Sequence, residues 1–412
     1  MDKRRVVITG LGIVSPIGTG KENYWAGLMK CESAAAPVTA FDASGYATTF
    51  ACEVKDFNPE NYIDPKKVRK MDRFVQFAMA AAKMAMEDSS LNVVNEDPYR
   101  LGVIVASGIG GLITVEKEEK VLLERGPRRI SPFLIPMMII NMAGGEIAIR
   151  WGLKGPNYSV VSACASANHA LGTALRLIQY GDADVMLAGG TEASITPIGL
   201  GGFCALKALS TRNAEPKRAS RPFDKERDGF VMAEGAGILV LEELSHAEKR
   251  GAHIYAELAG FGATDDAYHI TAPSPDGEPS AKTLEFCLRD ANVRPGEVDY
   301  FNAHGTSTPL NDKGETAAIK KVFGDHAYKM LVSSTKSMTG HMLGAAAANE
   351  IIATLLCMQN GIVHPTINYE NPDPECDLDY VPNKPREYKV KVALSNSLGF
   401  GGHNATILVK TL

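Results

Sequence analysis

The stretch YSVVSACASANHALGTALRLI, residues 158–178, changes from an apolar run to a helical pattern at Cys164. Residues 158–161 predict a β-strand. Beyond them, small and apolar residues recur at the i, i+3, i+4 and i+7 spacing that predicts a helix with one buried face. Cys164 therefore lies at a strand-to-helix bend, where the free N–H groups of a helix N-terminus favour a thiolate. The bend leaves two interpretations open, a buried structural cysteine or a catalytic nucleophile.

The same change of pattern recurs along the chain. Strand-like runs that alternate with helical ones include RRVVITGLG (4–12), LGVIVASG (101–108), DVMLAGGTEA (184–193) and EVDYFNAHG (297–305). This alternation predicts an α/β fold with mostly buried sheets. The chain has 412 residues and is 45% hydrophobic, which suffices for one large core or for two domains.

A weak internal repeat relates the stretch around Cys164 to a later one. VVSACASANHALG (160–172) aligns with VSSTKSMTGHMLG (332–344), so that Cys164 falls on Lys336 with an offset of 172 residues. Two further matches follow in the same order and place His304 opposite Ser107 and Gly399 opposite Gly229. Three ordered matches predict a duplicated α/β unit, with halves at residues 1–250 and 251–412.

The composition excludes several classes of protein. A net charge of −5 argues against nucleic acid as a partner, because phosphate binders carry a basic surplus. The seven cysteines include no CxxC pair, which argues against a disulfide framework or a zinc site and fits the cytoplasm. The start, MDKRRVVITGLGIVSPIG, is interpreted as a first strand and turn, and no apolar run is long enough to span a membrane.

Two histidines and a lysine are candidates for chemistry beside Cys164. His304 lies in the loop sequence NAHGTSTPLND, and His341 lies in STKSMTGHMLGAAAANE, in the first turns of a predicted helix. Each could be an ordinary core or surface histidine, but the repeat places both facing Cys164. Lys336 at a helix start opposes the helix dipole, so its presence needs a compensating purpose.

Glycine loops at SGIGG (107–111) and SNSLGFGGHNA (395–405) fit neither phosphate-binding pattern. They are better interpreted as places where backbone N–H groups can reach a substrate oxygen.

Taken together, several blocks resemble the signature sequences of β-ketoacyl-[acyl-carrier-protein] synthases, most closely those of the elongating type II. They are SACAS, NAHGTSTPLND, SSTKSMTGHMLGAA, SNSLGFGGHNA and RPFDKERDGFVMAEGAGILVLEELSHAEKRGA. The resemblance covers essentially the whole chain. It implies a thiolase-type, five-layered αβαβα fold built from two duplicated halves, and a homodimer. NHALGTALRLI and MIINMAGGEIAI depart from the family pattern, which concerns the substrate range more than the chemistry.

The resemblance also implies roles for individual residues. Cys164 would accept the acyl group, His304 and His341 would serve malonyl decarboxylation and stabilise the enolate, and Lys336 and Glu350 would be supporting charges. Further positions match those that hold the pantetheine arm (Thr306, Thr308), gate the site (Phe400) and line the acyl pocket (Ile109, Phe203). Some relatives bind a cation near the matches to Asn302, Glu350, Ser395 and Asn396. The prediction assigns no metal to the catalytic site and no bound cofactor, because the substrates carry 4'-phosphopantetheine on acyl carrier protein.

Acyl carrier protein is the partner that the resemblance implies. Because that carrier is acidic, basic residues should gather where it docks. The candidates are Lys66, Lys67, Arg69, Lys70, Arg128, Arg129 and Lys207, which could also be ordinary solvated side chains.

The implied reaction is the decarboxylative condensation of acyl- and malonyl-carrier protein in fatty acid elongation, with a polyketide ketosynthase as the alternative. A biosynthetic thiolase would need a second cysteine in SNSLGFGGHNA, and a type III synthase would replace one histidine by asparagine. A non-catalytic partner subunit would lack Cys164. A cysteine hydrolase stays open and would release free fatty acid.

Overall fold

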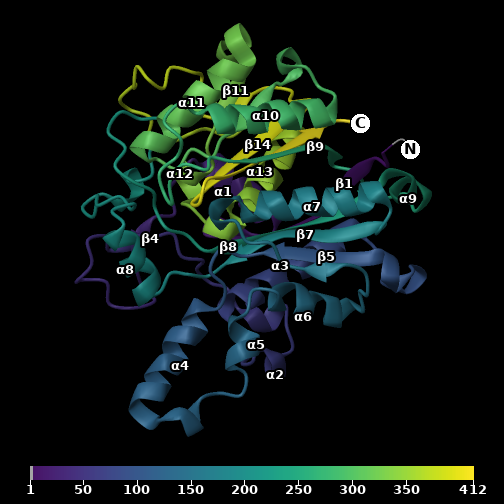
Figure 1. Cartoon of the computed structure of the whole chain (residues 1–412), viewed down its shortest axis with the longest axis vertical. Helices are drawn as coiled ribbons and strands as arrows, with labels where there is room; N and C mark the ends of the chain where they lie inside the picture. The colour runs from purple at the N-terminus through teal and green to yellow at the C-terminus, as the bar shows by residue number, and fades with distance from the viewer. Residues whose placement is uncertain (1–2) are drawn as a thin grey trace.

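A computed structural model describes residues 3–412, and a large mixed β-sheet runs through it (Figure 1). Its eleven strands are β1 (Val6–Ser15), β2 (Gly18–Thr19), β5 (Leu101–Ala106), β6 (Asn157–Tyr158), β7 (Val185–Glu192), β8 (Gly235–Glu243), β9 (Ala256–Asp265), β10 (Tyr300–Asn302), β11 (Leu331–Ser333), β14 (Val392–Gly399) and β15 (His403–Lys410). Two small ribbons pair β3 (Ala36–Pro37) with β4 (Phe50–Ala51) and β12 (Ile362–Val363) with β13 (Arg386–Glu387).

The strand order shows the duplication directly. From one edge it runs β6-β5-β7-β8-β1, and from the other edge β11-β10-β14-β15-β9. In each half the first three strands are parallel and the last two join antiparallel. The halves meet where β1 pairs with β9 at only two positions. The predicted boundary at residue 250 falls between helix α9 (Leu244–Lys249) and β9.

Helices separate and cover the two halves of the sheet. Helix α3 (Arg73–Ser89) packs on the outer face of the first half, and α10 (Glu278–Ala291) and α11 (Pro309–Phe323) cover the second. Between them lie α7 (Ser166–Tyr180) and α13 (Ala346–Asn360), which contact strands of both halves. This is the five-layered αβαβα architecture that the family resemblance implied.

Close approach of helix to sheet depends on glycine in the first strand. A Cβ atom on Gly12 would lie 1.8 Å from the carbonyl oxygen of Ala81 in α3, so a side chain there would push the helix away. The buried face of α3 carries Phe74, Phe77 and Ala78, and Asp72 caps the helix by accepting from the N–H of Phe74 at 3.3 Å.

The remaining helices lie at the periphery, and α4 and α5 form a projecting arm (Figure 1). They are α1 (Lys21–Lys30), α2 (Pro65–Val68), α4 (Leu112–Arg125), α5 (Leu134–Met138), α6 (Met142–Trp151) and α8 (Pro197–Ala205). The short helix α12 (Lys336–Thr339) is by contrast buried along its whole length. Within residues 3–412, every helix is too short or too polar to cross a lipid bilayer.

The structure corrects the register of the predicted repeat. Two short 3₁₀ turns, η5 (Ala163–Ala165) and η9 (Leu343–Ala345), each lead into a 15-residue helix, α7 and α13. Their first residues have almost the same positive φ, 48° at Ala163 and 47° at Leu343. Cys164 therefore corresponds to Gly344, and the prediction that it falls on Lys336 was wrong. Helix α12, between β11 and η9, has no counterpart in the first half and shifts the register.

Two local predictions also need correction. The strand expected at 158–161 is only the two-residue β6, and η5 precedes the predicted helix. His341 lies in the segment between α12 and η9, where a bridge to Met232 replaces the expected helix. By contrast, Ser107 and His304 do follow corresponding strands, β5 and β10.

Candidate active site

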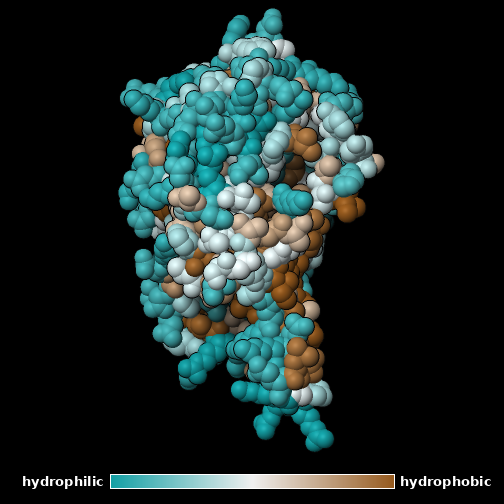
Figure 2. All heavy atoms as spheres, turned by 90° about the vertical axis from the view of Figure 1, so that its left-hand side faces the viewer, coloured by the Kyte–Doolittle hydropathy of each residue, from teal (hydrophilic) through white to brown (hydrophobic). Residues whose placement is uncertain are grey.

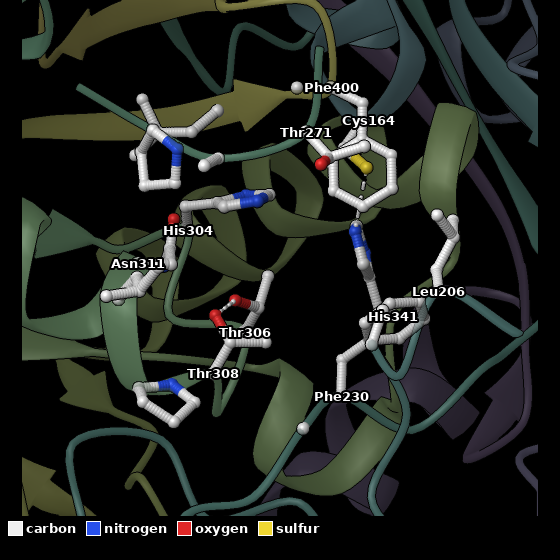
Figure 3. Close-up of a pocket in the computed structure, with 18 of the residues that line it drawn as sticks. Cys164, Leu206, Phe230, Thr271, His304, Thr306, Thr308, Asn311, His341 and Phe400 are labelled. Carbon is white, nitrogen blue, oxygen red and sulfur yellow. Dashed lines mark hydrogen bonds between the residues drawn. The ribbon is translucent and has the colours of Figure 1, made fainter. Parts of the chain in front are cut away.

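A pocket of about 400 Å³ opens where the two halves meet, and it brings together residues far apart in the sequence. Figure 3 shows Cys164, His304 and His341 around it, with Phe400 beside the sulfur. Eight of the predicted site residues line this pocket: Cys164, Phe203, Lys207, His304, Thr306, Thr308, His341 and Phe400. Cys164 comes from the first half and both histidines from the second.

Cys164 is the central residue of η5, and its side chain is buried. Burial raises the pKa of its thiol to about 12, whereas the Lys336 charge and the backbone N–H of Phe400 act to lower it. Desolvation thus acts against the thiolate that the N–H groups of a helix N-terminus favour. Nε2 of His341 lies 3.0 Å from Sγ.

His304 is held in one defined state by its neighbours. Lys336 Nζ lies 3.4 Å from His304 Nδ1 and forms an ion pair with Glu350. An ammonium group can only donate, so Nδ1 accepts, and the proton of the neutral ring is at Nε2. Burial and the Lys336 charge hold the pKa of His304 well below its usual value. The ring therefore presents a neutral N–H donor to the pocket. A lysine at a helix start is unfavourable, and fixing the tautomer of His304 is what compensates for Lys336 at that position.

His341 is fixed through its backbone rather than through its ring. Its N–H donates to the carbonyl of Val231 at 2.7 Å, and its carbonyl accepts from Ala233 at 3.0 Å. Burial and Lys336 hold its pKa well below the usual value. Its Nδ1 has no hydrogen-bond partner among residues 3–412, so neither neutral tautomer is held by a second contact.

Two buried carboxylates support this site, and the sequence analysis missed both. Glu315 accepts from the N–H groups of His304 and Gly305, each at 2.8 Å, and Glu192 accepts from four donors around residues 107–109 and 344. Burial raises the pKa of each to about 7. The available signal was an acidic residue that ends the apolar strand DVMLAGGTEA, and one on the helix after NAHGTSTPLND.

The residues predicted to contact the substrate do not all line the same pocket. Thr306 and Thr308 share a 3.0 Å hydrogen bond (Figure 3), and Phe203 packs edge-on against Phe230 with ring centroids 5.3 Å apart. Ile109 does not line this pocket. It lines a second, open hollow with residues such as Met138.

Comparison with known proteins identifies the family of the chain. The family models described as the N-terminal and C-terminal domains of beta-ketoacyl synthase match residues 3–247 and 255–370. The chain belongs to the β-ketoacyl synthase family.

Relatives of this β-ketoacyl synthase match over nearly their whole length. It is 55% identical over 409 residues to a 3-oxoacyl-[acyl-carrier-protein] synthase 2 of Coxiella burnetii, covering 99% of both chains. It is 54% identical to the protein of the same name from Synechocystis, covering 100% of this chain and 99% of the relative.

Solved structures confirm the fold of this β-ketoacyl synthase. A type II polyketide ketosynthase in complex with its acyl-carrier protein superposes with a TM-score of 0.91 at 39% identity, covering 100% of both chains. A β-ketoacyl synthase from Burkholderia phymatum gives 0.92 at 34% identity, covering 99% of this chain and 100% of that one. The thiolase-type architecture is thereby confirmed.

The basic residues predicted to dock the carrier protein on this β-ketoacyl synthase are exposed, and they lie in several separate segments of the chain. Lys70 lies 5.0 Å from the ring centroid of Phe133 on the projecting arm, and Lys207 lies at the pocket. The other exposed members of the set are Lys66, Lys67, Arg69, Arg128 and Arg129. A docking role for them stays a prediction.

Whether a cation binds near Asn302, Glu350, Ser395 and Asn396 stays a prediction, and three of these residues have the chemistry for it. Asn302 on β10 and Ser395 on β14 are directly paired residues of the sheet. The backbone carbonyl oxygen of Glu350 accepts a hydrogen bond from Asn302 Nδ2 at 3.4 Å. All three have a buried side-chain oxygen without a partner among residues 3–412, as a hard cation requires. Asn396 differs, because its oxygen accepts from Thr406 at 2.7 Å. Within the described chain there is no cluster of three or more His, Cys, Asp or Glu suited to a metal.

Proposed function

We propose that the chain is a 3-oxoacyl-[acyl-carrier-protein] synthase of fatty acid elongation. It condenses acyl- and malonyl-carrier protein to 3-oxoacyl-carrier protein, CO₂ and free carrier protein. The observation that carries this proposal is one cysteine thiol and two neutral imidazoles around a single pocket. Relatives at 49–55% identity that bear the synthase 2 name support it.

In the first half-reaction the acyl group moves from the carrier thioester to Cys164. His341 Nε2, 3.0 Å from Sγ, accepts the thiol proton as sulfur attacks the carbonyl carbon. The backbone N–H of Phe400 reaches the Cys164 side chain and, with that of Cys164, would meet the oxyanion. The proton then passes to the leaving thiolate of the carrier.

In the second half-reaction malonyl-carrier protein loses CO₂. The pair of electrons from the broken C–C bond enters the enolate, whose oxygen accepts from Nε2–H of His304. His341 adds a second donor once Cys164 is acylated, because its unpartnered Nδ1 lets the proton move to Nε2. The carbanion attacks the carbonyl carbon of acyl-Cys164, the C–S bond breaks, and the leaving Cys164 thiolate takes up a proton from solvent. No separate base is needed, since the loss of CO₂ makes the carbanion.

The proposed partner is acyl carrier protein, which brings the phosphopantetheine arm past Thr306 and Thr308 at the pocket. Support comes from the ketosynthase neighbour, which was solved in complex with its carrier protein. The cycle uses no bound cofactor, because the substrates carry their own 4'-phosphopantetheine. All seven cysteines are free thiols, in keeping with the proposed cytoplasmic location.

A homodimer is proposed on the basis of exposed apolar surface. Apolar side chains gather along one flank and continue over the projecting arm (Figure 2). Exposed members on α4 and α5 are Leu123 (78%) and Ile135 (58%), and Val161 lies by the Ile109 hollow (54%). Such a patch is unusual on a monomer. Light scattering should give twice the 44.1 kDa chain mass, and a monomer at micromolar concentration would contradict this proposal.

The deciding assay incubates the purified protein with acyl- and malonyl-carrier protein and weighs the product. A two-carbon extension with CO₂ release is expected. Free fatty acid without extension would instead identify a cysteine hydrolase. Repeated extension of one chain without reduction would identify the alternative, a polyketide ketosynthase, of which one solved example is 39% identical to this chain.

A further inference from the structure

Glu192 ends β7 and has 0% of its surface exposed, yet it accepts hydrogen bonds from both halves of the molecule. Oε1 accepts from Ser107 Oγ at 2.9 Å and from the N–H of Ile109 at 3.3 Å. Oε2 accepts from the N–H groups of Gly108 at 2.7 Å and Gly344 at 3.0 Å. Among residues 3–412, no Lys, Arg or His forms an ion pair with it.

The carboxylate lies where three backbone segments touch. A Cβ on Gly344 would be 2.3 Å from the nitrogen of Gly108, and a Cβ on Gly108 would be 2.9 Å from Glu192 Oε2 and 3.7 Å from the carbonyl oxygen of Ala163. Ala163 precedes the nucleophile. The loop after β5, the turn η5 with Cys164 and the turn η9 therefore meet with Glu192 beside them.

The η9 turn needs such support because Leu343 has a φ of 47°. A leucine adopts this conformation only when its surroundings hold it. The Leu343 side chain packs with Cys164 and lines the catalytic pocket. The hydrogen bond from Gly344 to Glu192 fixes the peptide that follows Leu343.

We propose that Glu192 is a positioning residue for the acyl-transfer half of the reaction, a proposal that rests on the proposed function. Its carboxylate joins the loop at residues 107–109 to the Leu343–Gly344 turn and so holds the surroundings of Cys164. The malonyl half has separate supports: Glu315 holds the backbone of His304, and Val231 and Ala233 hold that of His341.

The charge of Glu192 suits this task. Burial raises its pKa to about 7, whereas the surrounding N–H and O–H donors lower it. Four donors and no acceptor face its oxygens, so the carboxylate form satisfies all of them. A carboxamide would turn an NH₂ group towards N–H donors and lose at least one bond.

The test compares Glu192→Gln with Glu53→Gln. Glu53 is a matched control, because it is also buried and accepts from Thr39 and Ala40 in another loop. Acylation of Cys164 is followed by intact mass, and CO₂ release is measured in the Cys164→Ala background. For Glu192→Gln, kcat for acylation should fall at least tenfold with KM for the carrier substrate within twofold, and CO₂ release should change less than threefold. Glu53→Gln should change neither rate by more than threefold.

If Glu192→Gln acylates Cys164 at the wild-type rate, or if it loses acylation and CO₂ release to the same extent, the proposal is overturned. If Glu192→Gln does not fold, Ser107→Ala removes one donor without touching the carboxylate. It should slow acylation at least threefold with the same sparing of CO₂ release, and an unchanged acylation rate would again overturn the proposal. The proposed function fails separately, if the wild type neither acylates Cys164 nor releases CO₂ from malonyl-carrier protein.

Discussion

Sγ of Cys164 lies 3.0 Å from Nε2 of His341, and these residues come from opposite halves of the duplicated fold. Burial raises the pKa of the thiol and lowers the pKa of the imidazole, which favours a neutral proton-transfer pair over a preformed ion pair. Each half supplies one partner, so catalysis depends on how the halves are joined. The Leu343–Gly344 turn and Glu192 lie at that junction.

The protonation state of Cys164 can be measured by alkylation. Because burial raises its pKa to about 12, the thiolate fraction should rise about tenfold per pH unit between pH 7 and pH 9. The rate of iodoacetamide labelling, followed by intact mass, should rise by the same factor. The sign follows from a raised pKa, since fewer thiolates are present below it. A labelling rate that is already level at pH 7 would show a resting thiolate.

Two single variants should separate the half-reactions. Cys164→Ala should abolish acyl-enzyme and condensation but leave slow conversion of malonyl- to acetyl-carrier protein. His304→Ala should keep acylation and lose an enolate donor, which is typically worth about 2.7–4 kcal/mol, or 10²–10³ in the rate of CO₂ release. Intact mass and a CO₂ assay give both readouts. If His304→Ala loses acylation and keeps decarboxylation, His304 is instead the base of a cysteine–histidine pair.

His341→Ala should impair both half-reactions, because Nε2 faces the thiol at rest and the enolate later. We expect at least a tenfold loss of acylation together with a loss of CO₂ release similar to that of His304→Ala. Removal of both histidines should cost less than the sum of the two, since they act on one oxygen. Normal acylation by His341→Ala would remove the proton-accepting role.

Carrier docking can be tested by charge reversal on the arm. Arg128→Glu with Lys70→Glu should raise KM for the carrier substrate and weaken its dependence on salt, because long-range attraction is lost. Lys249→Glu is the control, an exposed lysine on α9, which lies away from the arm on another side of the molecule (Figure 1). If the double variant and the control have the same KM, the arm does not bind the carrier.

The predicted role of Ile109 in the acyl pocket can be tested with acyl primers of different lengths. Ile109→Phe should block long primers and spare short ones, since overpacking typically costs about 1–3 kcal/mol, which shifts the preference more than fivefold. The measurement is kcat/KM across a series of acyl-carrier substrates, with the short primers as the internal control. An equal loss at every length would place the acyl chain away from the hollow that Ile109 lines.

Local patterns in the sequence were enough to predict the α/β class, the duplication, the bend at Cys164 and the histidines that face it. Such features depend on residue type and spacing over short stretches, and the family blocks are contiguous. The register of the repeat could not be predicted, because helix α12 is an insertion in the second half, and the residue matches between the two stretches gave no sign of it.

The tertiary structure alone decided the protonation states and the supporting contacts. Burial raises the pKa of Cys164, and burial together with the Lys336 charge holds the pKa of His304 low; only packing brings Lys336 near. Glu192 and Glu315 looked like ordinary acidic residues in the sequence. Their hydrogen-bond donors lie 84 and 11 residues away in the sequence, so only the fold brings them together, and the desolvation of both carboxylates likewise depends on the whole fold.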